Sequence, residues 1–212
     1  MNNNNSSKQI LLSVLGVAIL VVAVVGISFA AFSYSKTGEV SNTITTGTIT
    51  MTYTEPTNGI SLTDALPITD DAGKILKGDG KTFDFTVGAT IAGTTNISYV
   101  ISAVKTANSD LPDSAVKVYL TATSGETETA VIEPKLVSQL DKTATGNDAG
   151  APADQYILKT GNYVATGTDN YRLRMWLDAN YGQKTDGVNT TEFASKHKYI
   201  LKINIYGAAK AQ

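Results

Sequence analysis

Alternating apolar and polar residues recur along most of this chain. In residues 83–87, Phe83, Phe85 and Val87 alternate with Asp84 and Thr86. The same period of two occurs in residues 49–53, 97–101, 116–120, 171–177 and 199–205. This period is typical of strands with one buried face, and Gly and Pro separate the stretches. Many short strands with few helices predict a mainly β fold, a two-sheet β-sandwich of the jelly-roll-like kind.

The order of the strands carries further expectations. Residues 83–87, 97–101 and 116–120 follow one another closely, and we expect them to form a meander. Residues 155–166 are typical of a hairpin with its turn near Gly161. These expectations rest on local sequence only.

Two short helices are also expected. Residues 133–142 carry Pro134 at a position that suits a first helical turn, and Leu136, Val137 and Leu140 share one helical face. A second short helix is expected from Asn189, which has Glu192 at the position of a capping box.

The N-terminus has a different chemistry. A polar leader with one charge, Lys8, precedes an uncharged and almost wholly apolar segment over residues 10–27. Ser28 and Ala30 then place small residues before a cleavage point at Ala31. A charged leader, an apolar stretch and a small-x-small exit together predict a secretory signal peptide.

The length of the apolar segment leaves a second interpretation open. It approaches the roughly 20 residues that a helix needs to span a bilayer, so a retained membrane anchor fits the same sequence. In both interpretations the rest of the chain is exported and works outside the cell. We therefore expect a signal peptide or anchor over 1–30, a strand segment over 31–53 and a β-sandwich domain over 54–212.

The composition excludes several classes of chemistry. The chain has no Cys, one His and a formal net charge of −2. Thiolate metal sites and cysteine nucleophiles are absent, and near neutrality gives no basic face for nucleic acid. The single histidine, His197, lies between two lysines and is interpreted as an exposed turn residue rather than part of a triad. We expect a protein that is not an enzyme and that has no resident cofactor.

Calcium is the one metal that the sequence leaves open. Asp178, Asn180, Asp186 and Asn189 could supply hard oxygen ligands from one loop, as weak extracellular calcium sites do. The spacing does not match an EF-hand, and Asp and Asn are also ordinary turn residues.

Trp176 raises two alternatives. With Arg172 and Arg174 on the same strand face, it could form a ligand surface that stacks on a sugar. The other interpretation is a Trp covered by a further layer of the fold, because large aromatic residues mostly fill cores.

The junction after the apolar segment resembles the start of TasA-like biofilm-matrix proteins and their camelysin relatives. The resemblance rests on Ala30, Ala31 and Phe32 at the cleavage site, followed by Gly47-Thr48-Ile49 in a strand-like context. It covers about 25 residues specifically. Leu66-Pro67 is loosely similar to the family's turn region, but the Gly-Asp that follows that proline in the family is absent.

The resemblance implies a long signal peptide cut by a dedicated peptidase and a secreted subunit of extracellular fibres. In such fibres the freed N-terminal segment of one copy completes the sheet of the next. Here that segment would carry Ile44, Ile49, Met51 and Tyr53 as its apolar positions. An open sheet edge is a ready template for such a strand. The alternative is that residues 33–53 form the first strands of their own domain.

Three further functions remain beside the matrix fibre. These are a membrane-anchored or pilin-like surface protein, a carbohydrate- or ligand-binding module centred on Trp176, and an enzyme. The fibre hypothesis predicts other copies of the chain as partners and leaves further matrix or cell-surface proteins open. It predicts membrane contact only through the N-terminal segment. The metallopeptidase activity described for camelysin relatives has no zinc-ligand spacing to support it here.

Overall fold

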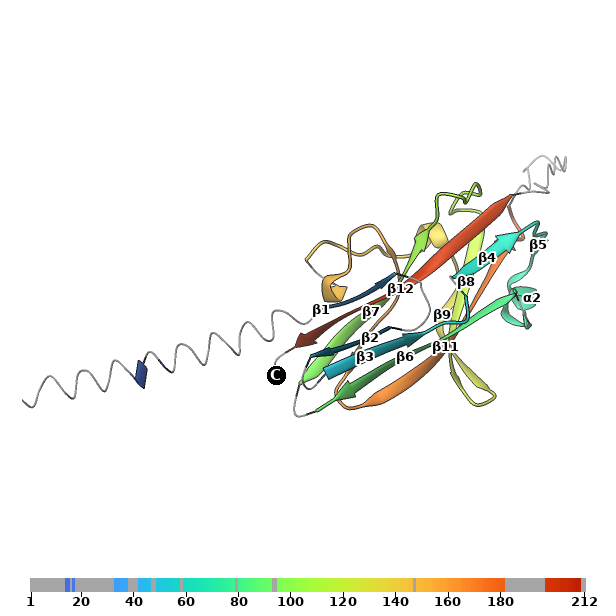
Figure 1. Cartoon of the computed structure of the whole chain (residues 1–212). Coiled ribbons are helices and arrows are strands. Elements are labelled where there is room, and N and C mark those ends of the chain that lie inside the picture. Colours follow the sequence, from blue (N-terminus) through green and yellow to red (C-terminus); the bar gives the residue numbers. More distant parts are fainter. Residues whose placement is uncertain are drawn as a thin grey trace, which may run out of the picture.

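A computed structural model describes residues 14, 15, 17, 33–37, 42–46, 49–57, 59–78, 80–92, 95–146, 148–181 and 197–210. Two β-sheets pack on each other as a sandwich (Figure 1). Sheet A contains β1 (Ser33–Thr37), β4 (Ile60–Thr63), β7 (Asn96–Lys105), β10 (Tyr156–Tyr163) and β12 (Lys198–Lys210). Sheet B contains β2 (Asn42–Thr46), β3 (Ile49–Thr54), β5 (Pro67–Ile68), β6 (Thr82–Ile91), β8 (Val116–Ser124), β9 (Thr127–Leu136) and β11 (Gly167–Asp178). The helices are α2 (Asp70–Lys74) and the 3-10 turns η1 (Val137–Gln139) and η2 (Asp148–Gly150).

The strand order confirms the predicted sandwich but not the predicted meander. Sheet A runs β1-β12-β7-β10, and β4 pairs with β12 on the same side as β1. Sheet B runs β2-β3-β6-β11-β8-β9, and β5 pairs in parallel with the end of β11. The meander was wrong because β6 and β8 lie in sheet B, whereas β7, between them in the sequence, lies in sheet A. Alternation predicts which side chains are buried, but it does not say which sheet a strand joins.

The core lies between the two sheets and is built from the alternating residues. Phe83, Phe85 and Val87 of β6 are fully buried, as are the inward residues of β12. The rings of Phe85 and Tyr171 stack with their centroids 5.4 Å apart. Each buried side chain of this size stabilises the fold by about 1.5–3 kcal/mol relative to an exposed one, so the alternating residues hold the sandwich together.

An interlock joins the two sheets near the C-terminal end of β12. A Cβ built on Gly207 would lie 2.1 Å from the Sδ atom of Met51, so the Met51 side chain of sheet B occupies the space that a larger residue would fill in sheet A. Met51 is fully buried there. The contact fixes β3 against β12 and makes β3 part of the core.

The expected helix over 133–142 was wrong for most of its length. Residues as far as Leu136 extend β9, and only the single 3-10 turn η1 follows. Pro134 lies in β9, which is an edge strand of sheet B. An edge strand tolerates a residue without a backbone N–H. The few apolar positions of this stretch fit both the helical period and the strand period, so the pattern did not separate the two. The second expected helix, from Asn189, lies outside the described residues.

The expected hairpin of 155–166 was wrong, because residues 156–163 form the single strand β10, which pairs with β7 in sheet A, and the next strand β11 lies in sheet B. Gly161 is inside β10, and the bend falls at residues 164–166 between β10 and β11. The glycine has a packing role, because a Cβ at this position would lie 2.6 Å from the ring of Tyr99 in the neighbouring strand β7.

The short helix α2 covers part of the outer face of sheet B. Thr69 begins it, and the Oγ1 of Thr69 accepts a hydrogen bond from the backbone N–H of Ala72 at 3.4 Å. Its Gly73 lies directly on the ring of Trp176, because a Cβ there would lie 2.4 Å from the indole carbons. The C-terminal half of β11, residues 173–178, is therefore buried on both faces.

Candidate assembly edge and ligand sites

Each sheet has two edge strands among the strands that the structure describes. They are β1 and β10 in sheet A, with β4 beside β1, and β2 and β9 in sheet B. An edge strand presents backbone N–H and C=O groups that another chain can pair with. The edges are therefore the places at which a strand-adding partner would bind.

The edges at β9 and β10 are interrupted. Strand β9 pairs with β8 through two register shifts and carries Pro134. Strand β10 has a register shift between Ile157 and Lys159, and Lys142 bridges Tyr156 at its start. Bulges, proline and partial cover are devices that keep sheet edges from pairing with other chains. These two edges are poor templates for assembly.

The edges at β1 and β2 both belong to the N-terminal segment. Strand β1 pairs with β12 from Ser33 opposite Ala208 to Thr37 opposite Asn204, and it has no second strand partner among the described strands. Strand β2, which follows β1 in the sequence, pairs with β3 and with no other described strand. Figure 1 shows β1 and β2 along the same side of the sandwich.

The four apolar residues predicted for assembly lie in two strands. Ile44 is in β2, and Ile49, Met51 and Tyr53 are in β3, which lies between β2 and β6. Met51 and Tyr53 are 0% and 1% exposed, so they belong to the core of the chain's own sandwich. The boundary expected after Tyr53 falls inside β3. In this single chain, residues 33–37, 42–46 and 49–53 therefore form strands of their own domain, and β1 and β2 are each held by a single ladder.

The predicted cleavage residues Ser28, Ala30 and Ala31 lie outside the described residues. Within 1–30, only Val14, Leu15 and Val17 are described, and these are helical and exposed. No described helix is long and apolar enough to cross a membrane. The signal peptide and the retained anchor both remain predictions.

The surface around Trp176, Arg172 and Arg174 is closed. Trp176 and Arg174 are each 1% exposed, and α2 covers the indole ring. This arrangement agrees with the interpretation of a covered Trp, and it leaves no ring face on which a sugar could stack. The alternation along β11 placed the three side chains on one face, but the cover by α2 has no signal in the sequence of β11.

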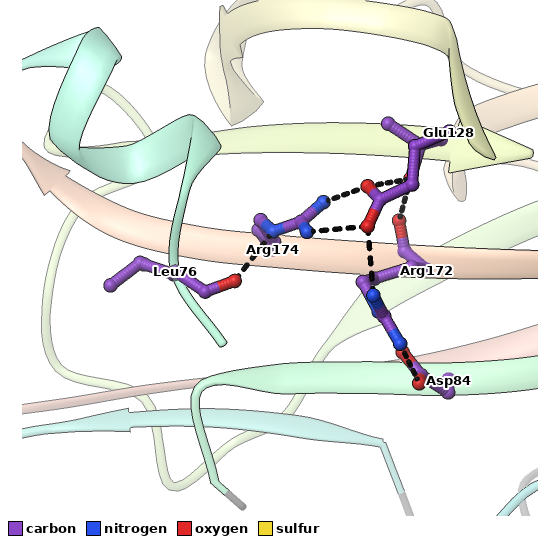
Figure 2. A network of polar contacts seen from close by, with 6 residues as sticks. Leu76, Asp84, Glu128, Arg172 and Arg174 are labelled. Carbon is purple, nitrogen blue, oxygen red and sulfur yellow. Dashed lines mark hydrogen bonds and ion pairs between the residues drawn. The ribbon is translucent and has the colours of Figure 1, made fainter. Parts of the chain in front are cut away.

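The two arginines bind carboxylates and a carbonyl of the chain itself (Figure 2). Arg174 donates to both carboxylate oxygens of Glu128 at 2.7 and 2.9 Å and, through Nε, to the carbonyl of Leu76 at 2.8 Å. Arg172 donates to both oxygens of Asp84 at 2.7 Å and to Glu128 at 2.8 Å. We call these five residues the Arg174 network. It ties β6, β9, β11 and the segment after α2 together across the outer face of sheet B.

We expect the sandwich to lose stability as the pH falls from about 4.5 towards about 2. Hydrogen bonds from Arg174 above all, and also from Thr121 and Arg172, lower the pKa of Glu128 from 4.5 to about 2. A carboxyl with a lowered folded pKa contributes its full stability above the unfolded pKa and loses it as the pH falls through the folded value. Urea unfolding at a series of pH values measures the effect.

The matched variant for this titration is Glu128→Gln, which removes the titrating group and keeps the size of the side chain. The gap in unfolding free energy between the two chains should shrink as the pH falls through this window. A gap that stays constant from neutral pH to pH about 2 would mean that Glu128 has an ordinary pKa.

The candidate calcium residues are only partly within the described chain. The Oδ1 atom of Asp178 lies 3.3 Å from the Nζ of Lys117 and accepts hydrogen bonds from the backbone and the side chain of Asn180. Asp186 and Asn189 lie outside the described residues. In the part of the chain that the structure places, no three His, Cys, Asp or Glu side chains are grouped to hold a metal. Asp178 here serves an ion pair.

The only histidine in the sequence lies at the start of the last strand. His197 is exposed, and its Nδ1 lies 3.1 Å from a carboxylate oxygen of Asp110. Its position agrees with the interpretation of an exposed turn residue.

Two neighbouring hollows lie beside the β3–β4 connection. They measure about 660 and 460 Å³, and Pro56 and Asp84 line both. Thr57, Ser61 and Thr82 supply hydroxyl groups to the larger one. Two carboxylates of the described chain line these hollows, and both already have partners: Asp84 pairs with Arg172, and Glu55 accepts a hydrogen bond from Tyr53.

Comparison with known proteins gives no family for the chain. No protein-family model and no curated protein matches it.

Proposed function

We propose that the chain is an exported structural protein, a subunit of extracellular surface or biofilm-matrix fibres that assembles by exchange of strand β1 between copies. The resemblance of residues 28–51 to TasA-like proteins supports the export and the fibre. The structure adds support of a different kind, from the position of β1 in the sandwich. The partner is another copy of the same chain.

The observation that carries the proposal is the attachment of β1. The strand begins at Ser33, two residues after the predicted new N-terminus at Ala31, and it pairs with β12 alone among the described strands. A terminal strand held on one side loses one ladder when it leaves and regains the same ladder on a neighbour. Exchange of an identical element is therefore a low-cost route to association.

The geometry of the exchange favours a filament. Donation from the N-terminus of one copy to the β12 edge of the next uses two different surfaces, and a heterologous contact that does not close extends without limit. An uncleaved apolar segment before Ser33 would hold the strand at the membrane. Cleavage before Ala31 then controls when exchange begins.

The first test is the identity of the extracellular product. When a bacterial host exports the full 212-residue chain, N-terminal sequencing should find Ala31 as the first residue. Electron microscopy should then show filaments, and a chain that lacks residues 33–37 should form none. The deletion is confined to β1 because a longer truncation, to Thr54, would also remove the core residues Met51 and Tyr53. A product that begins before Ile10 would favour the retained anchor, and equal filaments from both chains would exclude exchange of β1.

A cysteine pair distinguishes exchange from pairing within one chain. The sequence contains no Cys, so Ser33→Cys with Ala208→Cys gives one defined pair of direct partners. Such partners lie about 4.5–5.5 Å apart at Cα, which a disulfide can bridge. Oxidised filaments should give a ladder of covalent multimers on a non-reducing gel, because the two cysteines meet on different copies.

The matched control is Ser61→Cys with Ile200→Cys, which are direct partners in β4 and β12. This second pair should close within one chain and run as a monomer. A monomer band from both pairs would show that β1 stays on its own β12, and the proposed exchange would be wrong.

A further inference from the structure

A loop on sheet A lies over the strand that is proposed to exchange. The η2 loop comprises residues 143–155, of which 147 is not described. Its ends are joined, because the backbone N–H of Thr143 donates to the carbonyl of Gln155 at 2.8 Å and that of Asp154 donates to the carbonyl of Thr143 at 3.0 Å. A compact surface loop whose ends lie close together is an Ω-loop.

The tip of the η2 loop rests on three strands of sheet A. The turn η2 contacts β12, β7 and β1, and Figure 1 shows it next to β1. Ala151, just after the turn, is 3% exposed and packs with Tyr206 of β12 and Val100 of β7. Strand β1 is thus held by its ladder with β12 and by the loop.

The far end of the loop is anchored to the β12 residues that pair with β1. The Oε1 of Gln155 accepts hydrogen bonds from Ser102 at 2.6 Å and from Asn204 at 3.2 Å, and its Nε2 donates to the hydroxyl of Tyr206 at 2.9 Å. Asn204 and Tyr206 stand opposite Thr37 and Ser35 of β1 in the ladder. The loop and β1 therefore share the same stretch of β12.

The closed loop contains backbone strain and an unpaired polar atom beneath it. Asp148, Ala149 and Asp154 have φ of 52°, 55° and 66°, and they are three of the four non-glycine residues with positive φ in the described chain. Such conformations persist only where the surroundings hold them. The buried Oδ1 of Asn204 has no hydrogen-bond partner among the described groups. Because the segment is a surface loop and not one of the core strands, we expect it to open at a lower free energy than the core does.

We propose that the η2 loop is a latch that holds β1 on its own β12, and that opening of this loop controls the release of β1 for exchange between copies. The part about exchange rests on the proposed function. The part about holding β1 applies to a single chain and has its own measurement.

The test uses hydrogen–deuterium exchange of the exported chain, in the form that N-terminal sequencing identifies. Ala151→Glu places a charge in the apolar contact under the loop and should open it. The protection of the amides of residues 33–37 should then fall about tenfold or more. The matched control is Ala153→Glu, the same change at an exposed position two residues later, which should leave that protection as in the parent chain.

A second variant acts in the opposite direction. Ala149→Gly relieves a left-handed conformation and removes one partly buried methyl that packs against the Ala151 cluster. The loss offsets part of the gain, so exchange at 33–37 should slow by about twofold. If Ala151→Glu also removes the protection of β11, that variant has unfolded the sandwich, and Ala149→Gly then provides the test of the latch. Unchanged protection at 33–37 in Ala149→Gly, or in a folded Ala151→Glu, would overturn the latch.

The two proposals fail in different ways. If the variants change protection at 33–37 while no filaments form from any chain, the latch stands and the fibre function is wrong. If filaments form at equal rates from the parent chain and both loop variants, and protection does not change, the fibre function stands and the latch is wrong.

Discussion

Replacing Trp176 with alanine should lower the free energy of unfolding by about 3–5 kcal/mol, the cost of deleting a large buried aromatic side chain. The ring is 1% exposed and lies between β11 and α2, with Gly73 in direct contact. Its removal leaves a cavity beneath a helix of five residues, whose other ties to the sheet include the ion pairs of Asp70 with Lys117 and of Lys74 with Glu133. Because Trp176 is the only Trp, urea unfolding is best followed by circular dichroism rather than fluorescence.

The control for this variant is Trp176→Phe. The indole N–H has no hydrogen-bond partner among the described groups, so the phenyl ring loses volume but no hydrogen bond. We expect a cost below about 1.5 kcal/mol, as for other swaps that keep most of the volume. Loss of a ligand in Trp176→Ala would therefore report lost packing. If the free energy of unfolding of Trp176→Ala lies within about 1 kcal/mol of that of the parent chain, the indole ring does not support α2.

The core could be predicted because burial in a sandwich follows local alternation. Phe83, Phe85 and Val87 were assigned to one face from their spacing, and all three are buried. The partner of each strand could not be predicted in this way. Gly207 is an example. A side chain at this position would collide with Met51, which is distant in sequence and lies in the other sheet.

The ion pairs on the outer face of sheet B could not be predicted either, because they too depend on which strands lie side by side. The sequence placed Arg172 and Arg174 on one face of a strand, but it gave no sign of Glu128, which the ladder brings to them through β8. The misplaced helix over 133–142 has a related cause, because Pro134 suits both a first helical turn and an edge strand. Edge position is a property of the whole sheet.

The sequence gives no sign of how the candidate assembly segment divides into strands. Residues 31–53 have one composition throughout, rich in Thr and Ser. The two sheets divide them into β1, which pairs with β12 alone, β2, which pairs with β3 alone, and β3, which lies between two strands. Strand β3 belongs to the core of the chain's own sandwich, and of the two strands held by one ladder we propose β1 as the donor because it lies nearer to the predicted cleavage point.

Replacing Glu128 with glutamine should lower the free energy of unfolding by about 3 kcal/mol at neutral pH, the lower end of the cost of breaking a buried ion pair. Arg174 is 1% exposed and keeps its charge, so the variant leaves a buried guanidinium with the neutral amide, the carbonyl of Leu76 and the ring of Tyr119, and without the carboxylate of Glu128. The side chain of Glu128 is 24% exposed, and solvent reduces the loss below the upper end of the range.

The matched control is Asp84→Asn, which removes the other carboxylate of the Arg174 network. Asp84 is 51% exposed and pairs with Arg172, which still has Glu128 as a partner. An exposed pair of this kind contributes about 0–1 kcal/mol, so this variant should unfold close to the parent chain. Urea unfolding of the two variants side by side measures the contrast. Equal losses would mean that the burial of Arg174 does not set the cost. In that case the network would act as a set of surface ion pairs and not as the tie between β9, β11 and the segment after α2.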